Sequence, residues 1–251
     1  MNIIRVTTLL QKECLRFLRV YNQTIISPVV NGVILFIIFT FAFARDGGDE
    51  HYKTTVAIGM TIMIVLQASY LNTQSTITVS KVLGFIKDYT ITPLTKTEIM
   101  LAFCLAGCLR GIIVGALTFG SFAFFCEMPC ANIFIIAYYF IIGMILFAIL
   151  GIIIGFSSPD FDKSQAYYSY IIAPLTMLSG TFYSIDNLPP LWQKVILFNP
   201  VFYIIEGFRN GILGVSGKHE FLGFAVTALC VPVLLLIAVH CLKTNLQKID
   251  Y

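Results

Sequence analysis

The chain has 251 residues, of which 58% are hydrophobic and 12% are charged, and its formal net charge is +3. A soluble domain carries roughly 25% charged residues, so this composition argues against a disordered chain and against a water-soluble enzyme core. The small positive charge does not favour a nucleic-acid partner. A polytopic membrane protein fits these numbers, and we expect a single membrane domain over residues 1–251.

Residues 1–22 are predicted to form an amphipathic helix that lies along the membrane surface. Its residues recur at helical spacing on an apolar face and on a basic face, which suits contact with anionic lipid headgroups of the inner leaflet. The apolar face holds Ile3, Val6, Leu10, Phe17 and Tyr21, and the basic face holds Arg5, Lys12, Arg16 and Arg19. Two interpretations stay open, a plain anchor for the first span and a helix that also contacts a cytosolic partner.

Six long apolar runs predict an all-α fold with six transmembrane helices. Each run provides the stretch of about 20 residues that crosses a hydrocarbon core of about 30 Å. The predicted spans cover residues 25–44, 54–77, 99–125, 132–156, 164–183 and 220–242. Pro174 and Gly180 predict a kink or break in the fifth of them. An even number of spans places both termini on the same side of the membrane.

The distribution of Lys and Arg predicts that both termini are cytoplasmic. With that orientation the inner segments hold ten basic residues, Arg5, Lys12, Arg16, Arg19, Lys81, Lys87, Lys96, Lys163, Lys243 and Lys248. The outer segments hold five, Arg45, Lys53, Lys194, Arg209 and Lys218.

Span 54–77 is unusually polar for a membrane helix. Hydrocarbon penalises polar side chains, so we expect them to face protein or a wet cavity. Hydrogen bonding between helices is one interpretation. The other is a lining for a transport path, formed by Gln67 and Asn72 together with Pro174 of the fifth span.

Arg110 is a charged residue inside the third predicted span. It lies about 21 Å along the helix from Lys96, at 1.5 Å per residue, and therefore within the bilayer. A charge there costs at least about 2.5 kcal/mol unless it is paired or hydrated, so Arg110 needs an acceptor. Glu13 and the polar groups of span 54–77 are the expected partners, and a structural clamp is favoured over direct contact with cargo.

Residues 81–93 are predicted to form a short cytoplasmic helix between the second and third spans. Its apolar face consists of Val82, Phe85, Ile86 and Tyr89. Pro93 ends this segment because proline disfavours helix in the residue before it, and Thr95 with Glu98 fits a capping box that starts the next helix. A short helix across the ends of two spans can act as a lever arm.

Residues 188–214 are predicted to hold two outer half-helices. Pro190 suits the first turn of one, Asn199 and Pro200 suit the start of the other, and Gly214 suits its end. Both are strongly apolar but too short to cross the bilayer, so we expect them to enter the outer leaflet and return. Glu206 and Arg209 are three residues apart and can pair across one helical turn.

Sequence motifs of enzyme chemistry and of metal sites are absent. The chain lacks the phosphate-binding loop Gly-x-x-x-x-Gly-Lys-Ser/Thr, so we do not expect it to hydrolyse ATP, and no catalytic residue is predicted. It also lacks His-Glu-x-x-His and Gly-x-Ser-x-Gly. Cys126 and Cys130 could form an outer disulfide or a soft-metal site, but two unpaired cysteines are favoured and no metal is expected.

The outer segment carries a family resemblance. Gly180-Thr181-Phe182-Tyr183-Ser184-Ile185, Leu188-Pro189-Pro190-Leu191-Trp192, Asn199-Pro200, Tyr203 and Glu206-Gly207-Phe208-Arg209 resemble the ABC-2 type permeases, the membrane subunits of ATP-binding-cassette exporters. The likeness extends over the whole chain in its order of elements. Asp186-Asn187 departs from it, because more apolar residues are expected there.

The resemblance implies partners and cofactors that the residues alone do not show. Such permeases pair as dimers, here a homodimer, and bind two copies of a separate ATPase subunit, which holds ATP and Mg while the permease binds no cofactor. Residues 81–93 would be the coupling helix, the N-terminal helix a second ATPase contact, and Asp160–Lys163 a third. Cargo in the family includes polysaccharides, lipid-linked glycans, lipids, drugs and antibiotics.

The resemblance therefore implies export across the inner (plasma) membrane by alternating access, powered by the partner ATPase. The kinked fifth span and the outer half-helices would form the exit gate, with Pro190, Trp192, Asn199, Pro200, Tyr203, Glu206 and Arg209. The alternative is an autonomous ion-coupled carrier or channel, for which Arg110 is the one strong candidate residue and internal repeats are lacking.

Overall fold

The computed structural model describes residues 3–43, 50–87, 94–183, 185, 188–215, 217 and 220–247, and all regular structure in them is helical. Before the first interruption come α1 (Ile3–Arg19), the π-helical turn η1 (Asn22–Ile26) and α2 (Ser27–Phe43). The middle of the chain forms α3 (Glu50–Val82), the short 3₁₀ turn η2 (Phe85–Lys87), α5 (Lys96–Ala123) and α6 (Ile133–Ser157). The remainder forms α7 (Phe161–Tyr167), the π-helical turn η3 (Tyr168–Ile172), α8 (Ala173–Met177), α9 (Pro190–Leu197), α10 (Pro200–Leu213) and α11 (Glu220–Gln247).

Among the described residues, five helical segments are long and apolar enough to cross a membrane. They are Asn22–Ala42, Glu50–Val82, Lys96–Ala123, Ile133–Ser157 and Glu220–Thr244, and they coincide with five of the predicted spans. The remaining predicted span, 164–183, is divided into α7, η3 and α8, so its crossing of the membrane stays a prediction.

The break in the 164–183 segment is confirmed at the two residues that predicted it. The π-helical turn ends directly before α8, which has Pro174 in its first turn. Proline lacks the N–H that would continue regular helical bonding. Gly180 then has a φ of +79°, a backbone conformation that glycine adopts without steric cost.

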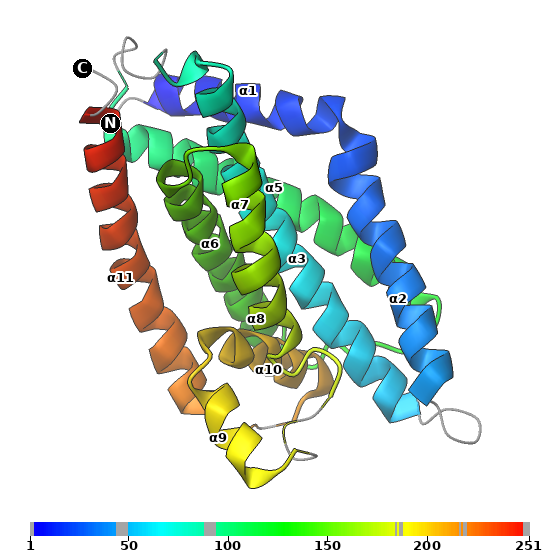
Figure 1. Ribbon diagram of the computed structural model, residues 1–251. Coiled ribbons are helices and arrows are strands. Elements are labelled where there is room, and N and C mark those ends of the chain that lie inside the picture. The colour runs from blue at the N-terminus through cyan, green and yellow to red at the C-terminus, as the bar shows by residue number, and fades with distance from the viewer. Residues whose placement is uncertain are drawn as a thin grey trace.

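α3 is the central helix, with α5 and α6 packed against it (Figure 1). Close packing depends on glycines of the neighbours: a Cβ at Gly151 of α6 would collide with Thr73 Oγ1 and with the carbonyl oxygen of Tyr70 on α3. A Cβ at Gly111 of α5 would collide with Ser69 Oγ. Small residues let membrane helices approach closely, where van der Waals contact and interhelical hydrogen bonds hold them together.

One end of the bundle gathers α1, η2, the start of α5 and the end of α11 (Figure 1). A shared apolar cluster joins these segments to the ends of α3 and α6 and includes Val6, Ile77, Ile86, Ile99, Phe156 and Leu242. The opposite end holds α9, α10 and the start of α11 (Figure 1). The first and last described helices therefore meet at the same end as residues 81–87.

The predicted starts of α5, α9 and α10 and the predicted end of α10 are confirmed, whereas Pro93, predicted to end the segment 81–93, lies outside the described residues. Thr95 and Glu98 form the capping box at the start of α5. Asn199 caps α10, Pro200 is its first residue, and Gly214 follows it with a φ of +70°. Pro190 is the first residue of α9.

Candidate functional site

A cavity of about 360 Å³ lies between η1 and α2 on one side and η3 and α8 on the other, with α3 between them. Its polar lining residues are Gln23, Ser27, Asn31, Gln67, Arg110 and Tyr168. Apolar side chains complete the wall, among them Leu35, Met60, Met63, Ile64, Leu71 and Met177. The cavity is therefore polar on one part of its surface and apolar on the rest.

Gln23, Ser27 and Asn31 are spaced four residues apart and form one polar stripe, which we call the α2 stripe. Residues four apart share a helix face, so all three line the cavity. Their side chains are exposed on an otherwise apolar helix. Since hydrocarbon disfavours exposed amides, the α2 stripe suits contact with water or a polar ligand.

Gln67 both lines this cavity and joins helices. Its side-chain nitrogen donates to Thr176 Oγ1 at 2.8 Å, and the hydroxyl of Tyr168 donates to its side-chain oxygen at 3.1 Å. These bonds connect the centre of α3 to η3 and α8, the broken segment. Gln67 therefore fits both interpretations of the polarity of span 54–77, because it forms hydrogen bonds between helices and also lines the cavity.

Thr73 and Gln74 of α3 face protein rather than this cavity. Thr73 donates to the carbonyl oxygen of Ala148 on α6 at 2.9 Å, and Gln74 donates to Ser164 on α7. Asn72 is buried away from the cavity, and its side-chain amide has no partner among the described residues. Pro174 is not a lining residue either, although its neighbour Ala173 is.

Arg110 is 6% exposed and reaches the cavity from α5. Its Nε donates to the carbonyl oxygen of Thr24 at 3.1 Å, in the π-helical turn η1. Pro28 is four residues beyond Thr24 and has no N–H to offer that carbonyl in regular α-helical bonding. The acceptor of Arg110 is therefore a backbone carbonyl, whereas Glu13, one of the partners expected from the sequence, binds Arg16.

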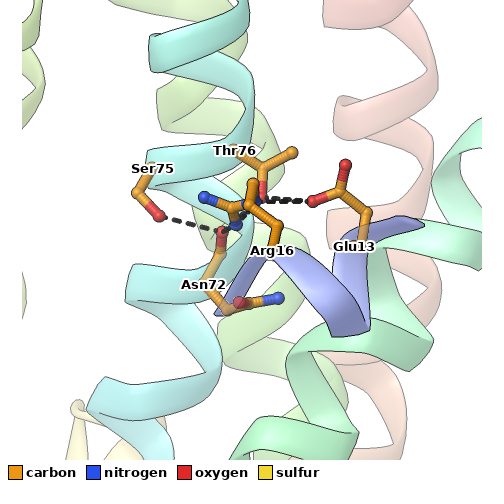
Figure 2. A network of polar contacts seen from close by, with 5 residues as sticks. All are labelled: Glu13, Arg16, Asn72, Ser75 and Thr76. Atoms are coloured by element: carbon orange, nitrogen blue, oxygen red, sulfur yellow. Dashed lines mark hydrogen bonds and ion pairs between the residues drawn. The ribbon is translucent and has the colours of Figure 1, made fainter. Parts of the chain in front are cut away.

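A polar network joins α1 to α3 (Figure 2). Arg16 Nε donates to Glu13 Oε2 at 2.9 Å, and Arg16 Nη2 donates to the carbonyl oxygen of Asn72 at 3.2 Å and to Thr76 Oγ1. Thr76 Oγ1 also lies 2.9 Å from Glu13 Oε2, and Ser75 donates to the Asn72 carbonyl. Figure 2 shows both charged side chains directed from α1 toward α3.

This network corrects the sequence-based placement of Arg16 on a face that meets lipid headgroups. Glu13 is 1% exposed, and a buried carboxylate is stable only when it is paired and hydrogen-bonded. The signal available in the sequence was the i, i+3 spacing of an acid and a base within the amphipathic helix.

Residues 81–87 present a small exposed apolar surface at the end of α3. Val82, Leu83 and Phe85 are 61%, 59% and 55% exposed, and we call these three residues the end patch. Ile86 does not share this face, because it is 6% exposed and packs into the cluster with Val6 and Ile99. A 3₁₀ turn has three residues per turn, so it directs adjacent side chains to different faces. Tyr89, predicted for the same surface, lies outside the described residues.

Lys81 connects the end patch to the end of α6. Its Nζ donates to the carbonyl oxygens of Phe156 and, at 2.9 Å, of Ser158. The last carbonyls of a helix lack partners within the helix, and a lysine there satisfies them. The loop that follows leads into α7, whose N-cap residue is Asp160.

At the opposite end, Asn199 and Arg209 hold the backbone that follows α8. Asn199 Oδ1 accepts from the N–H of Val201 at 3.0 Å. Its Nδ2 donates to the Leu175 carbonyl at 3.0 Å and to Ser179 Oγ at 2.6 Å. Arg209 Nη2 donates to the Gly180 carbonyl, and the carboxylate of Glu206, its expected partner, attracts this guanidinium electrostatically.

The remaining predicted gate residues lie on α9 and α10. Trp192 is exposed on α9, Pro200 begins α10, and the Tyr203 hydroxyl donates to the Leu197 carbonyl at 3.0 Å. Asp186 and Asn187, where the sequence departs from the family pattern, lie outside the described residues. The sequence analysis did not identify Ser179 and Thr181 as site residues. Their hydroxyls form hydrogen bonds within the broken segment 164–183.

Replacing Asn199 with Ala is expected to destabilise the protein by about 2 kcal/mol, because it removes the N-cap bond and two bonds to the end of α8. Asn132→Ala is the matched control, since Asn132 Oδ1 accepts from the N–H groups of Phe134 and Ile135 at the start of α6 and serves as a cap alone. Thermal unfolding in one detergent measures both. Equal shifts of the midpoint in the two variants would contradict the added role of Asn199.

In the part of the chain that the structure describes, neither Cys126 nor Cys130 forms a disulfide. Within the described ranges, no group of three or more His, Cys, Asp or Glu side chains is arranged to hold a metal ion.

Comparison with known proteins gives the family. Residues 5–213 match the sequence profile described as ABC-2 type transporter. The inner membrane transport permease YadH of Escherichia coli (strain K12) is 31% identical over 208 residues, which is 82% of this chain and 81% of YadH.

Two further relatives match over a shorter stretch. Nodulation protein J of Rhizobium leguminosarum bv. viciae is 28% identical over 102 residues, 41% of this chain and 39% of that protein. The capsule polysaccharide export inner-membrane protein BexB of Haemophilus influenzae is 30% identical over 103 residues, 41% of this chain and 38% of BexB. With its apolar helices and a profile match over most of its length, the chain belongs to the ABC-2 type transporter family of membrane transport permeases.

Proposed function

We propose that this chain is the permease subunit of an ATP-driven exporter in the inner membrane. Two copies would pair as a homodimer with two copies of an ABC ATPase, which binds ATP and Mg. The cargo is an amphipathic, lipid-like, drug or glycan molecule. The name of BexB refers to capsule polysaccharide export, and this supports export as the direction of transport.

The observation that carries the proposal is the end patch. Val82, Leu83 and Phe85 expose large apolar side chains just where the central helix leaves the predicted membrane region. Apolar surface exposed to water marks a site for a protein partner. The first turns of α1 and the start of α7 lie at this end too, which suits the three ATPase contacts implied by the family resemblance (Figure 1).

A mechanical connection leads from the end patch to the cavity. Lys81 ties the end of α3 to α6, and Ile86 anchors η2 in the apolar cluster. Further along α3, Gln67 bonds the broken segment at Tyr168 and Thr176. A push on the end patch would therefore reach the η3 and α8 wall of the cavity through α3.

In this arrangement the segment 164–183 completes a six-span topology, and α9 and α10 form the re-entrant pair at the outer face. Both termini and the end patch are then cytoplasmic. The cavity opens alternately inward and outward, with the break held by Asn199 and Arg209 as the exit gate. To move such a two-state equilibrium from 1:99 to 99:1, ATP binding must favour one state by about 5.5 kcal/mol.

Co-purification tests the proposal. We expect a neighbouring gene to encode an ABC ATPase, and we expect the chain co-expressed with that ATPase to purify as a complex of two permeases and two ATPases by native mass spectrometry. Reconstituted in vesicles, the complex should transport only with ATP. The ATPase alone, and the complex with a Walker A lysine substitution, are the controls. Solute movement by the purified permease without an ATPase would overturn the proposal in favour of a carrier or channel.

A carrier remains the second candidate because Arg110 lies inside the predicted membrane region. In the part of the chain that the structure describes, however, no carboxylate lies within 4.0 Å of Arg110. Proton-coupled carriers use titratable acids or histidines near the middle of the membrane, which makes the exporter the better supported function.

A further inference from the structure

We propose that the cavity beside Arg110 binds the anionic head group of an amphipathic molecule, and that the cargo belongs to this class. The inference rests on the proposed function and adds the charge of the substrate to it. Three independent features of the cavity carry it: an incompletely paired cation, a polar stripe and an apolar wall.

The first feature is the unused bonding capacity of Arg110. A guanidinium carries five N–H donors, and here one of them bonds the Thr24 carbonyl. In the residues that the structure describes, no acceptor is found for the terminal nitrogens, although the side chain is 6% exposed. Those donors belong to a residue that lines the cavity, so an anion there could accept from them.

The second feature is the local balance of charge. Arg16, a charged neighbour of Arg110, has the same sign, and among the described residues no carboxylate forms an ion pair with Arg110. The nearby carboxylate of Glu13 is already bound by Arg16 and Thr76. Arg16 and Arg110 together therefore carry one positive charge that no fixed carboxylate balances. In a site of low dielectric constant, that charge attracts an anion strongly.

The third feature is that one part of the cavity wall is polar and the other part is apolar. The α2 stripe and Gln67 offer hydroxyl and amide groups that can bond the oxygen atoms of a phosphate or carboxylate head group. Met60, Met63, Leu71 and Met177 offer apolar surface to a hydrocarbon chain. The volume of about 360 Å³ is at the low end for small-molecule sites, so it holds a head group and the first part of one chain. A bare inorganic anion would leave the apolar wall unused.

The test uses the full-length permease alone in nanodiscs of neutral phosphatidylcholine. The probe is dodecyl phosphate, compared with dodecyltrimethylammonium, which has the same chain and the opposite charge, and with inorganic phosphate, which has no chain. Binding is measured by native mass spectrometry over a range of concentrations. We expect one dodecyl phosphate per chain and weak or no binding of the two comparison probes.

Substitutions locate the site. Arg110→Gln should weaken dodecyl phosphate binding by tenfold or more, since one charge-assisted contact is lost, while Arg110→Lys should retain part of it. Arg19→Gln is the matched control, because it removes the same charge from an exposed position of α1 and should leave binding unchanged. Asn31→Phe fills the cavity from the exposed α2 stripe and leaves Arg110 unchanged, and it should also weaken binding.

Four results would overturn the inference. They are equal affinity in wild type and a folded Arg110→Gln, unchanged affinity in Asn31→Phe, inorganic phosphate binding as tightly as dodecyl phosphate, and displacement of the probe when phosphatidylglycerol replaces part of the bilayer. The last would assign the site to a bilayer lipid rather than to cargo. Failure of the ATPase to co-purify would remove the proposed function but leave this binding measurement intact, so the two failures are distinguishable.

Discussion

Phe85→Asp is expected to abolish ATPase-driven transport while leaving the permease folded and inserted. Phe85 is more than half exposed at the end of α3, so replacing it costs the isolated chain little. At an interface, however, burying a Phe side chain is worth about 1.5–3 kcal/mol, and an unpaired carboxylate in its place adds a desolvation cost. A few central, well-packed residues carry most of the binding energy of an interface, and Phe85 is the aromatic residue of the end patch.

The measurement is the ATPase rate and the transport rate of the reconstituted complex, together with the yield of the ATPase on the purified permease. Phe124→Asp is the matched control: Phe124 is 90% exposed just beyond the end of α5, away from the end patch. We expect this control to retain the complex. If Phe85→Asp bound the ATPase and transported at the wild-type rate, the end patch would not be the coupling surface.

Arg16→Met is expected to destabilise the protein by about 3 kcal/mol and to release α1 from α3. It leaves Glu13, which is almost fully buried, without the cation that binds it. The Arg16 side chain is one-third exposed, so we take the lower end of the range measured for breaking buried pairs.

Two controls separate the network from general effects of charge. Arg19→Met removes a positive charge from an exposed position on the same helix and should change stability by less than about 0.5 kcal/mol. The double variant Glu13→Gln with Arg16→Met should recover much of the loss, because no buried charge then remains unpaired. Chemical unfolding in a single detergent measures all three. A single Arg16→Met variant as stable as Arg19→Met would contradict the network as a lock between α1 and α3.

Local features of this chain were predictable from its sequence. The length and hydropathy of the apolar runs predict the five apolar helices of the described residues, because each segment must by itself be long and apolar enough to cross a bilayer. The caps at Thr95, Asn199 and Gly214 follow from residues within one or two turns of each helix end. The break near Pro174 and Gly180 follows from the covalent properties of those two residues.

The partners of the charged residues were decided by the tertiary structure alone. Arg110 finds a carbonyl 86 residues away, and Arg16 finds Thr76 on another helix, because packing brings together segments that no short-range pattern connects. Ile86 turns inward for the same reason, to complete a cluster supplied by distant helices. The sequence by itself determines which segments are helical and apolar. The tertiary structure determines which helix faces meet, and therefore where the cavity and its free donors lie. Those faces are chosen by close contact between glycines and side chains of different helices, which depends on three-dimensional fit.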